Sequence, residues 1–134
     1  MRVTLSLVLW FAMTATVVEA RAGSLASEKD INTGLFNVAV ADKIRRQCDE
    51  ISPRLFTAMS YLQALKSEAR KRGYSDAEID RYIEDPAEKS KMRARRDAYI
   101  RASGAEPDEG PSMCTLGRQE IARQSQIGQL LKAR

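Results

Sequence analysis

The sequence contains no histidine, and this absence excludes several kinds of active site. Without an imidazole the chain cannot form a Ser-His or Cys-His nucleophile pair, a histidine-ligated zinc site or the commonest proton shuttle near neutral pH. Two cysteines are also too few for a four-thiolate zinc site. A phosphate-binding glycine loop and a Gly-x-Ser-x-Gly elbow are missing as well. We therefore expect a protein that is not an enzyme, with no catalytic residue, no cofactor and no metal.

Aromatic residues are scarce, at 6% of the 134 residues, whereas 30% of the residues are charged. The single tryptophan, Trp10, lies in the first segment of the chain. This composition predicts a thin hydrophobic core, and a small domain with a thin core gains much from an added covalent cross-link.

The first 22 residues have the layout of a secretory signal peptide. Arg2 gives a positive start, residues 3–18 are uncharged and mostly apolar, and Ala20-Arg21-Ala22 is a small-x-small cleavage site. The apolar run is shorter than the roughly 20 residues that a membrane-spanning helix needs. We expect cleavage after Ala22, with Ala20 as the alternative, and therefore a periplasmic or secreted protein.

The remaining 112 residues carry 20 Lys and Arg against 17 Asp and Glu, so the expected mature domain is mildly basic. A nucleic-acid-binding protein would show a stronger basic excess and interleaved aromatic residues, so we expect no nucleic-acid partner. This charge permits weak contact with anionic membrane surfaces.

Beyond the signal, the pattern predicts a flexible leader over residues 23–31 and a single helical domain over residues 32–134. No segment shows a sustained alternation of apolar and polar residues, so we predict an all-α fold. The expected architecture is a small irregular or orthogonal bundle of four to five helices, stapled by one disulfide. The helices are expected near residues 32–47, 53–72, 76–83, 86–103 and 112–131.

The second expected helix has the clearest apolar face in the chain. Ser52 is predicted as its N-cap and Pro53 as its first residue, with Ile51 and Phe56 forming a hydrophobic staple. Gly73 is predicted to stop this helix. Apolar residues at helical spacing predict the face that packs into the core: Leu55, Ala58, Met59, Leu62, Leu65 and Ala69.

Other helix ends are marked by local signals. Ser75 and Glu78 have the spacing of a capping box, and Asp85 precedes a proline in the way that an N-cap does. Gly117 and Gly128 lie inside the last expected helix, where each costs about 1 kcal/mol relative to alanine. We infer that another helix packs closely over these two positions.

Cys48 ends the first expected helix and Cys114 begins the last, each on the apolar side of its helix. We predict a disulfide that closes a loop of about 67 residues and stabilises the fold by roughly 4 kcal/mol on the chain-entropy model. A redox-active pair is the alternative, but reactive pairs usually lie close together as Cys-x-x-Cys.

Basic residues form the remaining candidate site. They are interpreted as a solvated surface, with a docking surface for an acidic partner or lipid as the alternative: Arg70, Lys71, Arg72, Lys89, Arg93 and Arg96. We favour a non-enzymatic exported protein that binds an unknown protein partner or serves as an envelope accessory factor. The alternatives are a peripheral module that binds anionic membranes through its basic helices, and a minor carboxylate-dependent hydrolase.

Four stretches carry a family resemblance: residues 34–42, 48–54, 73–79 and 114–122. Together they resemble small exported alphaproteobacterial proteins catalogued as domain of unknown function 5333, over about residues 31–134. The paired cysteine positions are the most specific part of the resemblance. It implies export and a disulfide, and it implies no activity, cofactor or catalytic residue.

Overall fold

A computed structural model describes residues 24–134 of the chain. The signal peptide expected over residues 1–22 therefore lies outside the described residues. In chain order the elements are η1 (Leu25–Ser27), α1 (Lys29–Gln47), β1 (Ile51–Pro53), α2 (Leu55–Lys71), α3 (Asp76–Glu84), α4 (Pro86–Ala102), α5 (Gly110–Ala122), α6 (Gln126–Gln129) and β2 (Leu131–Ala133).

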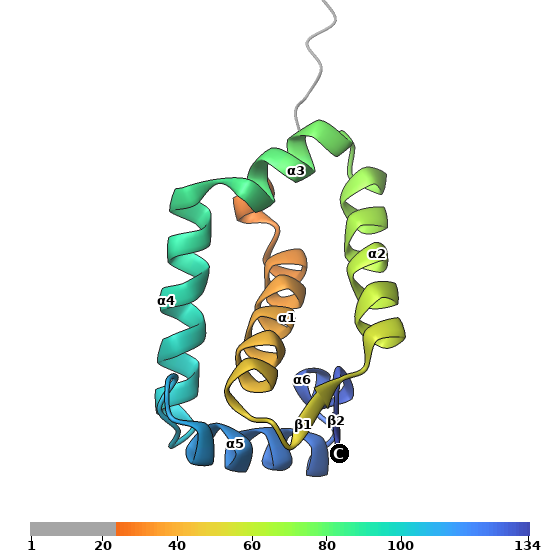
Figure 1. Cartoon of the computed structure of the whole chain (residues 1–134). Coiled ribbons are helices and arrows are strands. Elements are labelled where there is room, and N and C mark those ends of the chain that lie inside the picture. Colours follow the sequence, from red (N-terminus) through yellow and green to blue (C-terminus); the bar gives the residue numbers. More distant parts are fainter. Residues whose placement is uncertain (1–23) are drawn as a thin grey trace, which may run out of the picture.

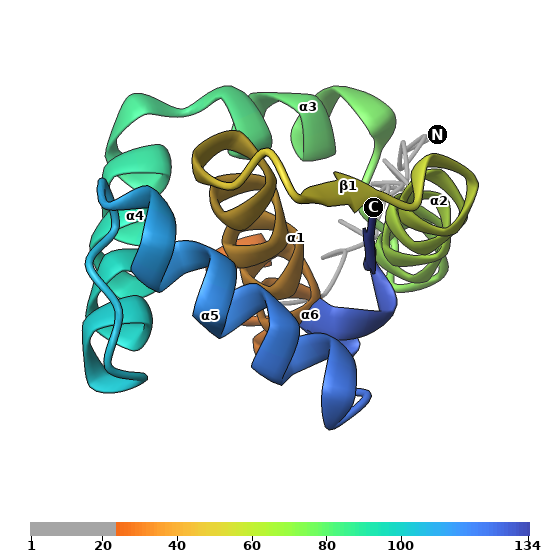
Figure 2. The same ribbon diagram turned by 60° about the horizontal axis from the view of Figure 1, so that its bottom comes forward.

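Helix α1 is the centre of the molecule. Helices α2 and α4 flank it on opposite sides, and α3 crosses one end between them (Figure 1). At the other end α5 runs across α1, with α6 and the two short strands beside it (Figure 2). The predicted all-α irregular bundle is confirmed, with one small antiparallel pair of strands added to it.

The core is divided into two clusters of buried residues. The larger surrounds the disulfide end of α1, and the smaller lies where α1 begins and α2 and α3 meet. The first contains Phe36, Val40, Ala41, Ile44, Cys48, Ile51, Ile100, Ala105, Met113, Cys114, Leu116, Ile127, Leu130 and Leu131, and the second contains Leu25, Ile31, Ala69, Tyr74 and Ile79.

The second cluster corrects the predicted leader. Residues 24–31 were expected to precede the folded domain, but they contain the 3-10 turn η1 and the start of α1, which begins at Lys29 rather than near Asn32. Leu25 and Ile31 are buried against Ala69 and Ile79, and this contact draws the segment into the fold.

The predicted start of the second helix is wrong. Ser52 and Pro53 lie in β1, which pairs with β2, and α2 begins only at Leu55. The expected staple is absent because Ile51 is buried in the core while Phe56 is 91% exposed. Residues 51–53 pair instead with a strand about 80 residues later in the chain. The prediction failed because a capping pattern takes account only of residues close in sequence.

The caps of the next two helices are confirmed. The Glu78 N–H donates a hydrogen bond to the Ser75 hydroxyl, and the Ser75 N–H donates one to the Glu78 carboxylate, so the capping box of α3 is complete. Asp85 caps α4, whose first residue is Pro86. These signals depend on residues within one helical turn, which is why they could be read directly.

The last predicted helix is interrupted. Gln124 adopts a positive φ of 53°, Ser125 caps the short α6, and the chain then enters β2. Close packing over both glycines is confirmed: a Cβ at Gly117 would overlap Ile44 of α1 and Ile51 of β1, and one at Gly128 would overlap the backbone of Glu120. At Gly128 the neighbouring helix is α5, which was predicted to continue into the same helix. The break lets α6 fold back onto α5.

Within residues 24–134, no helix is long and apolar enough to cross a membrane.

Candidate functional site

The predicted disulfide between Cys48 and Cys114 is present, with the two Cα atoms 5.1 Å apart. Both cysteines are buried in the larger core cluster. The bridge joins the end of α1 to α5, and β1, β2 and α6 pack against these two helices. Its burial favours the structural role over the redox alternative.

The junction between β1 and α2 is held by backbone contacts with the end of the chain. Pro53 is opposite Leu131 in the strand pair, and the Arg54 N–H donates a hydrogen bond of 2.8 Å to the Leu130 carbonyl. Leu130 and Leu131 are both buried. The first turn of α2 is therefore fixed in position while its outer side faces solvent.

Three large apolar side chains are exposed on that first part of α2. Leu55 is 67% exposed, Phe56 91% and Met59 60%, and we call these three residues the α2 ridge. Two of them, Leu55 and Met59, were predicted to belong to the core-facing side of this helix, and that prediction is wrong. Only one residue of α2, Ala69, is buried.

Three cations lie next to the start of α2. Arg54 immediately precedes the α2 ridge, Lys132 lies opposite Ser52 in the strand pair, and Arg134 directly follows β2. All three are exposed and form no ion pair with any residue in the described part of the chain. Arg134 donates to the Ser52 hydroxyl at 2.6 Å. An apolar surface with a positive border suits a partner with an apolar centre and an acidic rim.

The six basic residues considered as an alternative docking surface do not gather on one side of the molecule. Arg70 is paired with Asp76 at 2.6 Å, and Arg96 is half-buried and paired with Asp97 at 2.7 Å. Those of α2 and those of α4 lie on opposite sides of α1 (Figure 1).

Arg72 is the most heavily engaged of the six. It binds Glu28 and Asp30 at the start of α1 and Glu68 on its own helix. Its hydrogen bonds lower the pKa of Asp30 to about 2. Arg72 therefore serves to join two helices and is not available as a free docking cation.

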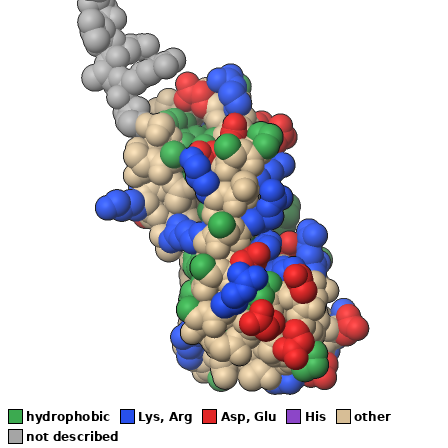
Figure 3. Space-filling model, turned by 90° about the vertical axis from the view of Figure 1, so that its left-hand side faces the viewer, with side chains coloured by type: hydrophobic (Ala, Val, Ile, Leu, Met, Phe, Trp, Pro, Cys, Tyr) green, Lys and Arg blue, Asp and Glu red, His purple; other side chains and the backbone are tan. Residues whose placement is uncertain are grey.

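Lys71, Lys89 and Arg93 are exposed, and none of them has an ion-pair partner among residues 24–134. Seen from the α4 side, Lys and Arg side chains lie among acidic and apolar ones instead of forming a continuous basic patch (Figure 3). This mixed pattern is typical of a solvated surface.

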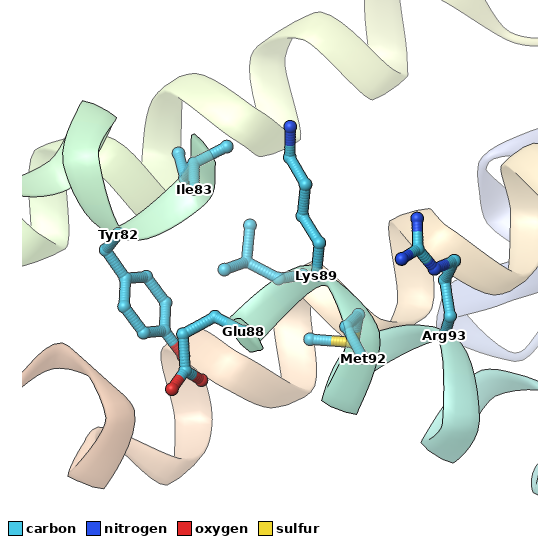
Figure 4. A pocket seen from close by; sticks show the side chains of 7 residues that line it. Tyr82, Ile83, Glu88, Lys89, Met92 and Arg93 are labelled. Carbon is cyan, nitrogen blue, oxygen red and sulfur yellow. The ribbon is translucent and has the colours of Figure 1, made fainter. Parts of the chain in front are cut away.

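Lys89 and Arg93 do share one local feature, a pocket at the junction of α1, α3 and α4. It has a volume of about 220 Å³ and is lined by Leu35, Tyr82, Ile83, Glu88, Lys89, Met92 and Arg93. Figure 4 shows Ile83 and Met92 around the space, with the Lys89 and Arg93 side chains extending to one side. Sequence reasoning missed the pocket because its lining comes from three helices.

Glu120 on α5 is a fully buried carboxylate that sequence reasoning also missed. Burial alone would raise its pKa, but hydrogen bonds from Ser125, Tyr99 and Arg123 outweigh burial and hold the pKa of Glu120 below its usual value. The charged carboxylate joins α4 to the turn between α5 and α6. Because three hydrogen-bond donors satisfy this buried carboxylate, we interpret Glu120 as a structural residue.

Comparison with known proteins adds one match. A family model described as a family of unknown function (DUF5333) matches residues 23–132. Searches of curated proteins and of solved structures find no match. Among the described residues, no group of three or more cysteine or acidic side chains is placed to hold a metal ion.

Proposed function

The chain belongs to a family of unknown function, DUF5333, and from its structure we propose that it is a non-enzymatic, exported accessory protein of the cell envelope. It binds a partner protein through the α2 ridge. The partner surface presents an apolar pocket for Phe56 with acidic side chains around it.

The exposed apolar area carries this proposal. Scattered apolar residues on a surface are ordinary, but Leu55, Phe56 and Met59 are adjacent on one and a half turns of a helix. Aromatic side chains of this kind dominate the energy of protein interfaces when a partner covers them. The junction with β1 and β2 holds the ridge in place before binding, which lowers the entropic cost of association.

The positive border supports the acidic character of the partner. Arg54, Lys132 and Arg134 have no carboxylate partners in the described structure, so an acidic rim would pair with them without displacing an existing ion pair. Export is supported by the disulfide, since disulfides form and persist in oxidising compartments.

Site-specific photo-crosslinking in intact cells tests the proposal. A photoreactive residue at position 59 is expected to yield a discrete protein adduct, and the same residue at exposed Arg81 on α3 is not. Adding Phe56→Ser should remove the adduct from position 59. Because Phe56 is 91% exposed, this substitution should leave the melting temperature unchanged.

Two results would overturn the proposal. One is the same adduct from positions 59 and 81, which would indicate non-specific contact. The other is an adduct with lipid in place of protein, which would assign the α2 ridge to a membrane surface.

A further inference from the structure

The pocket between α1, α3 and α4 lies where the two core clusters meet. Leu35 and Tyr82 pack against the smaller cluster, and Met92 packs against the larger. The lining residue Ile83 is 47% exposed, so apolar surface remains open to solvent at this point. An apolar group bound here would connect the two clusters.

The charged residues around the pocket differ in whether they have an ion-pair partner. Glu88 is held by Lys91 at 2.8 Å, and the Tyr82 hydroxyl donates to Asn32. Lys89 and Arg93 lie one helical turn apart on α4 and have no such partner anywhere in residues 24–134. The pocket therefore combines an apolar interior with two unpaired cations at its edge, a combination that is complementary to an amphiphile with a negative head.

We propose that this pocket binds a single-chain anionic amphiphile, namely a free fatty acid. The hydrocarbon chain contacts Leu35, Ile83 and Met92. The carboxylate binds Lys89 and Arg93, whose side chains extend to one side of the pocket (Figure 4).

The pocket has room for one hydrocarbon chain. Its volume of about 220 Å³ exceeds the roughly 150 Å³ of a cavity that holds benzene, but it is smaller than the ~300–1,000 Å³ of sites for drug-sized ligands. One medium-length acyl segment fits this space, and the paired chains of a phospholipid do not. The pocket lies at the opposite end of the molecule from the α2 ridge (Figure 1), so this inference and the proposed function stand or fall separately.

Calorimetric titration with decanoate, below its micellar concentration and at low salt, tests the proposal. We expect one saturable site and a rise in the melting temperature, because a ligand that binds only the folded state stabilises it. The double variant Lys89→Gln/Arg93→Gln should weaken binding by about ten-fold, the effect of losing two partly exposed ion pairs. Ile83→Trp should obstruct the opening and abolish binding.

Matched controls separate the pocket from general charge effects. Lys71→Gln/Arg81→Gln removes two exposed cations outside the pocket and should leave decanoate binding unchanged. Decyltrimethylammonium has the same chain length with a positive head and should not bind. Vesicles that contain phosphatidylglycerol test whether the anionic ligand is a membrane lipid instead of a free fatty acid. The protein should not bind these vesicles through Lys89 and Arg93.

Several outcomes would overturn the proposal. They are the absence of decanoate binding to the folded protein, equal binding of the cationic amphiphile, equal weakening by the two double variants, and binding to vesicles without binding to decanoate. The melting temperatures of all variants without ligand verify that each remains folded.

Discussion

Arg72 joins the beginning of α1 to the end of α2 through carboxylates on both helices. The Tyr74 hydroxyl donates a hydrogen bond to Glu28, one of the carboxylates that Arg72 binds. Because Tyr74 belongs to the smaller core cluster, the ion pairs of Arg72 lie at the edge of that cluster. From the sequence alone, Arg72 belongs to a basic run, Arg70-Lys71-Arg72, that was interpreted as a solvated surface with a docking surface as the alternative. Which of the three meets carboxylates depends on where α1 begins, and that is a tertiary feature.

Asp30 gives this contact a defined pH dependence. Its pKa is lowered from 3.8 to about 2 by Arg72, so between these values the unfolded chain binds more protons than the folded chain. The contribution of Asp30 to stability is therefore present above about pH 4 and is lost as the pH falls through about 2. We expect Asp30→Asn to be less stable than wild type at neutral pH, with the difference shrinking towards pH 2, as measured by urea unfolding.

Asp49→Asn is a suitable control for this measurement, because Asp49 is exposed and has no ion-pair partner within residues 24–134. A difference between wild type and Asp30→Asn that stays constant down to about pH 2 would contradict the assigned role of Arg72.

At the scale of elements, the break between α5 and α6 shows how one buried charge shapes the chain. Glu120 binds Ser125 across the turn, and Gly128 then packs against the backbone of Glu120. A continuous helix over residues 112–131 would place Ser125 and Gly128 too far along its axis to make these contacts. The buried carboxylate therefore favours a turn where apolar periodicity predicted a helix.

Gly128→Ala tests this arrangement. In an ordinary helix the change would stabilise the protein by about 1 kcal/mol. Here the new Cβ meets the backbone of Glu120, which cannot move aside, so we expect a loss of about 1–3 kcal/mol in the free energy of unfolding. Denaturant unfolding measures the change.

Gly117→Ala provides the comparison. Its Cβ would meet the ends of the Ile51 and Ile44 side chains, which can shift, so its loss should be smaller than that of Gly128→Ala. If Gly128→Ala were as stable as wild type, the close approach of α6 to α5 would be refuted.

The whole molecule depends on α1, which contacts α2, α4, α5, α6 and β1. The disulfide fastens the end of this helix to α5, 66 positions away in the sequence. Because the core is thin and divided in two, a cross-link of this span has a large share in holding the bundle together.

Cys48→Ala is expected to destabilise the protein by roughly 4 kcal/mol, the chain-entropy value for a loop of about 67 residues. Arg93→Ala, which removes an exposed side chain with no ion-pair partner among the described residues, should change stability little. Thermal melts of both variants test the difference. Melts of the wild type with and without reductant measure the effect of the disulfide itself. Similar melting temperatures for the two variants would contradict the structural role of the disulfide.

The sequence by itself determined the helical class, the caps at Ser75 and Asp85, and the pairing of Cys48 with Cys114. Caps involve atoms within one turn, and two cysteines on apolar helix faces have one possible partner each. The resemblance to DUF5333 was also visible in short stretches and is confirmed over residues 23–132.

Only the tertiary structure decided which apolar residues are inside. Ile51 and Phe56 are both large and apolar in sequence, yet Ile51 is buried beside Ile44 of α1 and Gly117 of α5, whereas Phe56 is left 91% exposed among the described residues. The pocket likewise requires three helices to meet. Apolar periodicity shows that a helix has a face to bury, but burial depends on whether another segment packs there, and that is decided by contacts between residues far apart in the chain.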